Sequence, residues 1–221
     1  MGTLLRLEDP APRLRAALRE RLGVDVGAEA AAAAMRAEIS YYRAHLHLGR
    51  DAESVDALRA RCAEAMRPAL GLPAPDPELT AALLDAIELS AYPDAAPALR
   101  ALRAAGWALV VVSNWDWSLH ERLEQAGLRS LVDGAVASAE VGAAKPERAI
   151  FERALELVGA AAERAWHVGD SVAEDVAGAR AAGLRAVLVA RADAATAGAG
   201  VPVIAGLDAL PALVAAGGAY P

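Results

Sequence analysis

The feature that most constrains the fold is a change in the sequence pattern after residues 92 and 93, a Tyr-Pro pair. From there onward, short and continuously apolar segments alternate with helical segments, which is typical of a parallel sheet covered by helices on both faces. The expected strands are residues 107–112, 135–138, 165–168, 186–190 and 201–204, and the expected helices between them are residues 94–105, 117–126, 146–158 and 173–182. The sequence therefore predicts a doubly wound, Rossmann-like α/β domain.

Residues 10–90 show a different pattern, in which apolar side chains recur at helical spacing and no segment is typical of a strand. Leucines, for example, stand at every fourth position between residues 14 and 22. Four helices with short connections predict a small bundle. We therefore expect residues 1–9 to belong to the α/β core, residues 10–90 to form an inserted four-helix domain, and residues 91–221 to complete the core.

Length and composition exclude several classes of protein. The 221 residues carry a formal net charge of -7, and the basic residues form no stripe of the kind that binds nucleic acid. Apolar runs such as residues 108–112 fall far below the roughly 18 residues of a membrane span, and the first ten residues lack the regions of a signal peptide. Cys62 is the only cysteine, which excludes an intrachain disulfide. We expect a cytoplasmic protein without nucleic-acid or membrane partners.

Polar side chains follow the predicted strands at their carboxyl ends, where α/β sheets carry their binding sites. Ser113 and Asn114 follow the first strand, and Lys145 comes after the second. We expect these three residues to bind the substrate, with Ser113 and Lys145 also taking part in catalysis. Asp170 follows the third strand, with Asp175 five residues later. A hydroxyl, an ammonium and two carboxylates at one sheet edge suit a phosphate held with a divalent cation. Asp170 would bind Mg²⁺, and Asp175 would hold a metal-bound water or fix Lys145.

Lys145 carries the strongest signal in this set. Of the 22 basic residues 21 are arginine, so the only lysine stands where the composition disfavours one. A compact ammonium and a guanidinium are not interchangeable at a charged site, which favours a catalytic role over that of a solvated cation. Alternatively, Asp170 and Asp175 could cap the next helix, and Ser113 and Asn114 could close a turn.

The histidines do not form a metal motif. His45 and His47 are two residues apart, which places them on different sides of a helix. His120 and His167 are expected to be structural, His167 because it falls within a predicted strand.

Three segments resemble motifs of the haloacid dehalogenase-like hydrolases. VVVSNWD at residues 110–116 resembles the second motif of that family, AKPERAIFERAL at 144–155 the third, and HVGDSVAEDVAGARAAGL at 167–184 the fourth. The resemblance covers nearly the whole chain, and its fourth motif is the most specific part. It implies a Rossmann-like core with an inserted helical cap.

The resemblance also implies a role for each matched residue. Ser113 would bind phosphate, Lys145 would be the lysine of the third motif, and Asp170 would bind Mg²⁺ with Asp175 as its supporting acid. Residues 10–90 would be the mobile cap that helps to select the substrate. Because the dehalogenating branch usually lacks the acidic pair, the resemblance favours a magnesium-dependent phosphatase of small phosphate esters that acts through an aspartyl-phosphate.

The first motif departs from the family pattern. Gly2 and Thr3 match the end of Asp-x-Asp-x-Thr, which makes Thr3 a candidate catalytic residue. The nucleophilic aspartate would stand ahead of Met1, together with a central strand whose loss exposes two unpaired strand edges. We therefore expect a truncated or late-starting sequence that has little activity as it stands. Two alternatives remain open: a non-catalytic protein that binds a ligand with this scaffold, and a 2-haloacid dehalogenase-like hydrolase.

Overall fold

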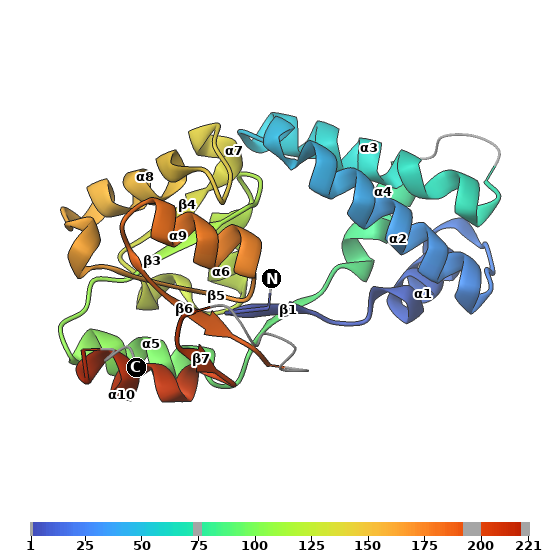
Figure 1. Cartoon of the computed structure of the whole chain (residues 1–221). Coiled ribbons are helices and arrows are strands. Elements are labelled where there is room, and N and C mark those ends of the chain that lie inside the picture. Colours follow the sequence, from blue (N-terminus) through green and yellow to red (C-terminus); the bar gives the residue numbers. More distant parts are fainter. Residues whose placement is uncertain (1, 73–76, 192–199, 218–221) are drawn as a thin grey trace. The chain divides into compact units, whose positions relative to one another are not determined.

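The chain divides into two compact units, an α/β unit and a helical unit (Figure 1). The computed structural model describes residues 2–72, 77–191 and 200–217. The α/β unit comprises residues 1–6, 91–114 and 119–221, and the helical unit comprises residues 7–90 and 115–118. Within the described ranges, no helix is long and apolar enough to span a bilayer.

The helical unit contains the four expected helices. They are α1 (Pro10–Leu22), α2 (Ala28–His45), α3 (Ala52–Leu70) and α4 (Pro77–Ala86), and a 3₁₀ turn, η1 (Leu46–Leu48), follows α2. Leu18, Met66 and Leu79 are fully buried in a core to which all four helices contribute. At the start of α3, Asp51 accepts a hydrogen bond of 2.9 Å from the Ser54 amide, which satisfies one of the unpaired amides of the first turn. The role of this unit as a cap stays a prediction.

A short segment, residues 115–118, joins the helical unit although it follows a core strand in the sequence. The Trp117 amide donates to the Gly49 carbonyl at 2.8 Å, and the Asp116 amide donates to the Tyr42 hydroxyl at 3.4 Å. A Cβ atom at Gly49 would come within 2.9 Å of the Asp116 Cβ, so the close approach requires glycine. These contacts explain why the helix predicted to begin at residue 117 begins only at Leu119.

The α/β unit alternates strands and helices, as the sequence predicts. Two short strands, β1 (Leu5–Leu7) and β2 (Leu89–Ala91), pair with each other near the boundaries between the units along the chain. The elements of the α/β unit after them are α5 (Ala95–Ala104), β3 (Val110–Ser113), α6 (Leu119–Gln125), η2 (Arg129–Leu131), β4 (Gly134–Ala137), α7 (Ser138–Val141), α8 (Arg148–Val158), η3 (Ala162–Arg164), β5 (Trp166–Gly169), a π-helical turn η4 (Val172–Val176), α9 (Ala177–Ala181), β6 (Arg185–Val189), β7 (Val203–Ile204), η5 (Leu207–Ala209) and α10 (Leu210–Ala215). Figure 1 shows α8 and α9 on one side of these strands and α5 and α10 on the other. The predicted doubly wound α/β core is confirmed.

All the pairings among β3 to β7 are parallel. Val110 to Ser113 of β3 pair in register with Gly134 to Ala137 of β4, and β6 pairs with β5 on one side and β7 on the other. No ladder joins β3 to β5 among the described strands. The valines of β3 are accordingly half-buried, whereas Val187 and Leu188 in β6 have no exposed surface. Strands β3 to β7 therefore form two parallel sheets instead of one continuous sheet.

The two largest boundary differences from the prediction in the α/β unit concern β3 and α9. The strand predicted from residue 107 begins at Val110, because the Leu109 amide and carbonyl both pair with Asp133 in place of a neighbouring strand. The helix predicted over 173–182 begins as the π-helical turn η4 and becomes α9 only at Ala177. Such turns are rare, and those that occur are often found at functional sites; η4 contains Asp175, one of the two candidate acids.

Candidate active site

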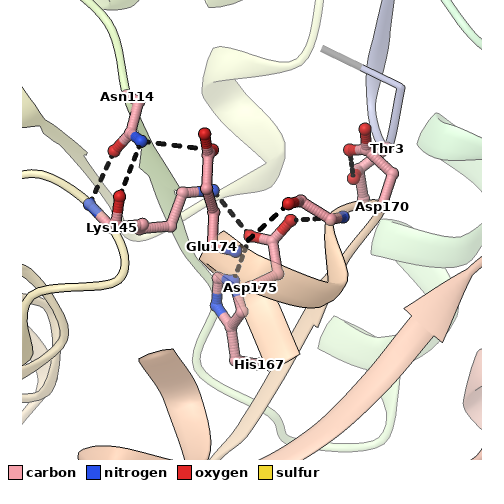
Figure 2. A network of polar contacts seen from close by, with 8 residues as sticks. Thr3, Asn114, Lys145, His167, Asp170, Glu174 and Asp175 are labelled. Atoms are coloured by element: carbon pink, nitrogen blue, oxygen red, sulfur yellow. Dashed lines mark hydrogen bonds and ion pairs between the residues drawn. The ribbon is translucent and has the colours of Figure 1, made fainter. Parts of the chain in front are cut away.

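The candidate site lies at the carboxyl ends of β3 and β5, within the α/β unit (Figure 2). Side chains from five separate segments meet there: Thr3, Asn114, Lys145, His167 and the run from Asp170 to Asp175. The sequence placed most of these residues at neighbouring strand ends. The structure shows how they bind one another.

Asp175 is the centre of the network. Its Oδ1 atom accepts a hydrogen bond of 2.6 Å from the Lys145 ammonium and lies 2.7 Å from the His167 Nε2 atom. Its Oδ2 atom accepts a hydrogen bond of 2.9 Å from the Ser171 amide. Burial would raise the pKa of this carboxyl group, but the hydrogen bond from His167 and the charge of Lys145 outweigh burial and hold the pKa well below its usual range.

The Lys145–Asp175 ion pair is largely shielded from water, with side chains that are 10% and 4% exposed. A buried charge is costly unless it is paired and hydrogen-bonded. Asp175 therefore fixes the position of the Lys145 ammonium, which is one of the two roles that the sequence left open for it. Its role toward a metal stays a prediction.

His167 belongs to this network, although we expected it to be structural. Burial lowers the pKa of its imidazole, so the neutral ring donates its Nε2 hydrogen to Asp175. The ring also meets Phe151 edge-on, at 5.0 Å between centroids. The alternation of side chains along the strand could have pointed to His167, because His167 and Gly169 share one face of β5. A Cβ atom at Gly169 would overlap the Asp175 carboxyl group, so this face of the strand meets Asp175.

Asn114, the only asparagine of the chain, holds the backbone on which Lys145 sits. Its Oδ1 atom accepts from the Lys145 amide at 2.7 Å, and its Nδ2 group donates to the Lys145 carbonyl at 3.0 Å. The same Nδ2 group donates to the Glu174 carboxylate at 3.2 Å. Asn114 therefore positions the lysine, and its predicted contact with substrate stays a prediction.

Asp170 forms the second part of the site. The Thr3 hydroxyl donates to its Oδ1 atom at 2.6 Å, which brings the N-terminal segment to the carboxyl end of β5. Gly2 has a φ of 111°, and a Cβ atom there would overlap the Asp170 carboxyl group. Only glycine fits this position, because a side chain would be both strained and obstructed. The sequence matched Gly2 and Thr3 to the first motif, and the structure places them against the acid of the fourth.

The simpler interpretation of the two acids, that they cap the next helix, does not describe what is observed. Ser171 takes that role, since its Oγ atom accepts from the Glu174 amide at 3.1 Å at the start of η4. Ser113 is the half-buried last residue of β3, directly before Asn114. Its predicted contact with phosphate stays a prediction.

The donor set suits a hard cation held by few protein ligands. Mg²⁺ usually keeps several waters and binds through one or two carboxylates together with substrate phosphate. Asp170 is an exposed carboxylate with one oxygen oriented by Thr3, and Glu174 lies in the same network. Among the residues described, no three His, Cys, Asp or Glu side chains converge into a closed metal site. The arrangement fits an open Mg²⁺ site on Asp170.

Comparison with known proteins agrees with the geometry. The family model of the haloacid dehalogenase-like hydrolases matches residues 2–183. The chain belongs to this family. Structures of other family members have the same fold: the phosphatase from Thermococcus onnurineus superposes with a TM-score of 0.66 at 25% identity, over 100% of this chain and 96% of the other. L-2-haloacid dehalogenase from Xanthobacter autotrophicus has a TM-score of 0.70 at 22% identity, over 98% and 96%.

Among curated relatives, this hydrolase is similar to two proteins named as phosphatases. It is 43% identical over 101 residues to phosphoserine phosphatase from Thermus thermophilus, covering 45% of this chain and 41% of that protein. It is 38% identical over 105 residues to glyceraldehyde 3-phosphate phosphatase from Methanothermobacter thermautotrophicus, covering 46% and 45%. The matches thus span less than half of the length of each relative.

Proposed function

We propose that this hydrolase is a magnesium-dependent phosphatase that acts on small phosphate esters. The observation that carries the proposal is that a fixed ammonium and an oriented carboxylate belong to one site, drawn in Figure 2. Lys145 is held by Asp175 at 2.6 Å, and Asp170 is held by Thr3 at 2.6 Å. A fixed cation and a metal-binding acid within one polar site suit a dianionic phosphate. The two phosphatase-named relatives support the same reaction class.

Each residue has a task in this proposal. Lys145 neutralises charge on the phosphoryl group, while Asp175 and Asn114 keep the ammonium in place. Ser113 donates its hydroxyl hydrogen to a phosphoryl oxygen. Asp170 would hold Mg²⁺, which when bound withdraws electron density from the phosphoryl oxygens.

In this proposal the covalent step runs through an aspartyl-phosphate: a carboxylate attacks phosphorus as the P–O bond to the alcohol breaks, the alcohol takes a proton as it leaves, and water then releases phosphate and restores the carboxylate. The attacking aspartate would be the first of Asp-x-Asp-x-Thr in the register of Thr3. Chemical activity is therefore tested in a chain that carries an apolar strand and an aspartate in the Asp-x-Asp-x-Thr register of Thr3.

The experiment compares this extended chain with its variants on aryl and alkyl phosphates in the presence of Mg²⁺. Asp170→Asn removes a charged ligand of the metal. Lys145→Arg keeps the positive charge but replaces the compact ammonium with a wider, planar guanidinium. We expect each to lower kcat about 100-fold, the usual effect of losing one electrostatic contact to the transition state. Asp56→Asn, on an exposed ion pair of the helical unit, is the matched control.

Retention of half the turnover in both site variants would contradict the proposal. So would an extended chain that binds Mg²⁺ and inorganic phosphate but hydrolyses none of the esters, because that is the behaviour of a binding protein.

A further inference from the structure

A second polar cluster of the α/β unit contacts the backbone of Thr3 and contains Arg191, two residues after β6. The guanidinium group binds the Asp94 carboxylate through both terminal nitrogens, each at 2.9 Å. It also donates to the backbone carbonyl of Gly2 at 3.0 Å and to that of Thr3 at 2.8 Å. The Tyr92 ring covers the guanidinium at 3.7 Å from the ring centroid.

Within the part of the chain that the structure describes, this geometry leaves Arg191 a single free N–H donor for any further ligand. A guanidinium has five N–H donors, and four of the bonds they can make go to Asp94, Gly2 and Thr3. The Tyr92 ring covers one face of the guanidinium in a cation–π interaction. Arg191 is therefore committed to the N-terminal backbone and to Asp94.

Asp94 is itself fixed, which makes the pair a rigid support. The Leu207 amide donates to its Oδ2 atom at 2.7 Å, and a Cβ atom at Gly206 would come within 2.8 Å of the same oxygen. Burial would raise the pKa of Asp94, but the hydrogen bonds from Arg191 and Leu207 lower it. Asp94 thus stays ionised and holds the guanidinium in one orientation.

The cluster reaches the site through Thr3. Arg191 binds the Thr3 carbonyl, and the Thr3 hydroxyl binds the Asp170 Oδ1 atom at 2.6 Å. The strand β1, which follows Thr3, has only three residues. The Arg191 contacts therefore add two hydrogen bonds that hold the Gly2–Thr3 backbone beside Asp170.

We propose that Arg191 is a positioning residue for the metal-binding carboxylate: it holds the Gly2–Thr3 backbone so that the Thr3 hydroxyl orients Asp170. The inference rests on the proposed function, in which Asp170 binds Mg²⁺. Partners that orient a metal ligand typically contribute 10- to 100-fold to metal affinity. An effect of Arg191 on metal binding, transmitted by Thr3, is the expected sign of this role.

The test measures binding of Mn²⁺, as a stand-in for Mg²⁺, to the chain as it exists, by the loss of the free-ion paramagnetic resonance signal. We expect Arg191→Met and Thr3→Val each to weaken Mn²⁺ binding by about tenfold. The double variant should bind Mn²⁺ no more weakly than Arg191→Met alone, because both changes break the same series of contacts from Arg191 through Thr3 to Asp170. Asp170→Asn identifies the site by abolishing binding.

Arg185→Met is the matched control, since Arg185 stacks on Trp166 and binds the Gly217 carbonyl, away from Gly2 and Thr3. It should bind Mn²⁺ like the wild type. Should Arg191→Met fail to fold, Arg191→Lys keeps the charge but cannot reach both carbonyls and the carboxylate, and it should still weaken binding several-fold.

Three results would overturn the inference, and they are distinguishable. If the wild type binds Mn²⁺ through Asp170 and the folded Arg191 variants bind equally well, the positioning role is wrong while the proposed function stands. If Asp170→Asn leaves Mn²⁺ binding unchanged, the metal role of Asp170 is wrong and the inference falls with it. Additive losses in the double variant would show that Arg191 does not act through Thr3.

Discussion

Glu38 should give the helical unit a stability that falls as the pH rises. Its side chain lies on α2 and is 5% exposed, and Asp116, 4% exposed, is a second buried carboxyl group of the same unit. Burial raises the pKa of Glu38 to about 7, although a hydrogen bond from the Cys62 thiol opposes the shift. Tyr42 lies beside Asp116, and burial raises the pKa of its hydroxyl as well. Glu38 is therefore protonated in the folded protein under mildly acidic conditions.

The sign of the effect follows from proton binding. An unfolded chain releases the Glu38 proton near pH 4.5, whereas the folded protein keeps it until about pH 7. Between these values the folded state holds more protons, so the free energy of unfolding decreases with rising pH. At about 1.4 kcal/mol for each pH unit, the interval from 4.5 to about 7 corresponds to a loss of about 3 kcal/mol. Glutamine has no such proton to lose.

We therefore expect Glu38→Gln to match the wild type near pH 4.5 and to exceed its free energy of unfolding by about 3 kcal/mol near pH 8. Urea unfolding followed by far-ultraviolet circular dichroism measures this difference. Burial lowers the pKa of His167, so His167 makes stability rise with pH in part of the same range, but it does so equally in both proteins. Glu29→Gln, exposed on the same helix, is the control. A difference that stays constant over this pH range would refute the reasoning.

Two further predictions concern the network around Asp175. Asp175→Asn should lower the free energy of unfolding at neutral pH by about 3 kcal/mol, because it leaves the buried Lys145 ammonium unpaired. Since the folded-state pKa of Asp175 is depressed, this contribution is present above pH 4 or so and is lost as the pH falls, so urea unfolding in acid should show the two proteins converging. Gly169→Ala should cost about 1–3 kcal/mol, because the added methyl group overlaps the Asp175 carboxyl group. Gly27→Ala, at a position with open space, should change the thermal midpoint little, and equal midpoints for both alanine variants would contradict the packing argument.

The sequence predicted those site residues whose positions follow from the order of strands and helices along the chain. Parallel strands place their carboxyl ends at one edge, so Lys145, Asp170 and Asp175 could be brought together without coordinates. Composition added weight to Lys145, because a lone lysine among arginines is unexpected. These arguments need only chain order and residue type.

The residues that the sequence missed depend on side-chain direction and on contacts distant in the chain. His167 reaches Asp175 because β5 turns that face toward η4, which the position of a strand alone does not reveal. Arg191 binds residues at the opposite end of the chain, and nothing local distinguishes it from the other arginines. The docking of residues 115–118 on the helical unit likewise overrides the helical pattern that predicted a start at residue 117.

That docked segment also bears on how the chain could be recombined with its relatives. The helical unit is not one continuous insert, because residues 115–118 complete it from a distant part of the sequence. A chimera that exchanged residues 7–90 alone would separate the Trp117 amide from the Gly49 carbonyl and the Asp116 amide from Tyr42. The smallest exchangeable module is therefore made of two segments, and the second begins one residue after Asn114, whose side chain holds Lys145.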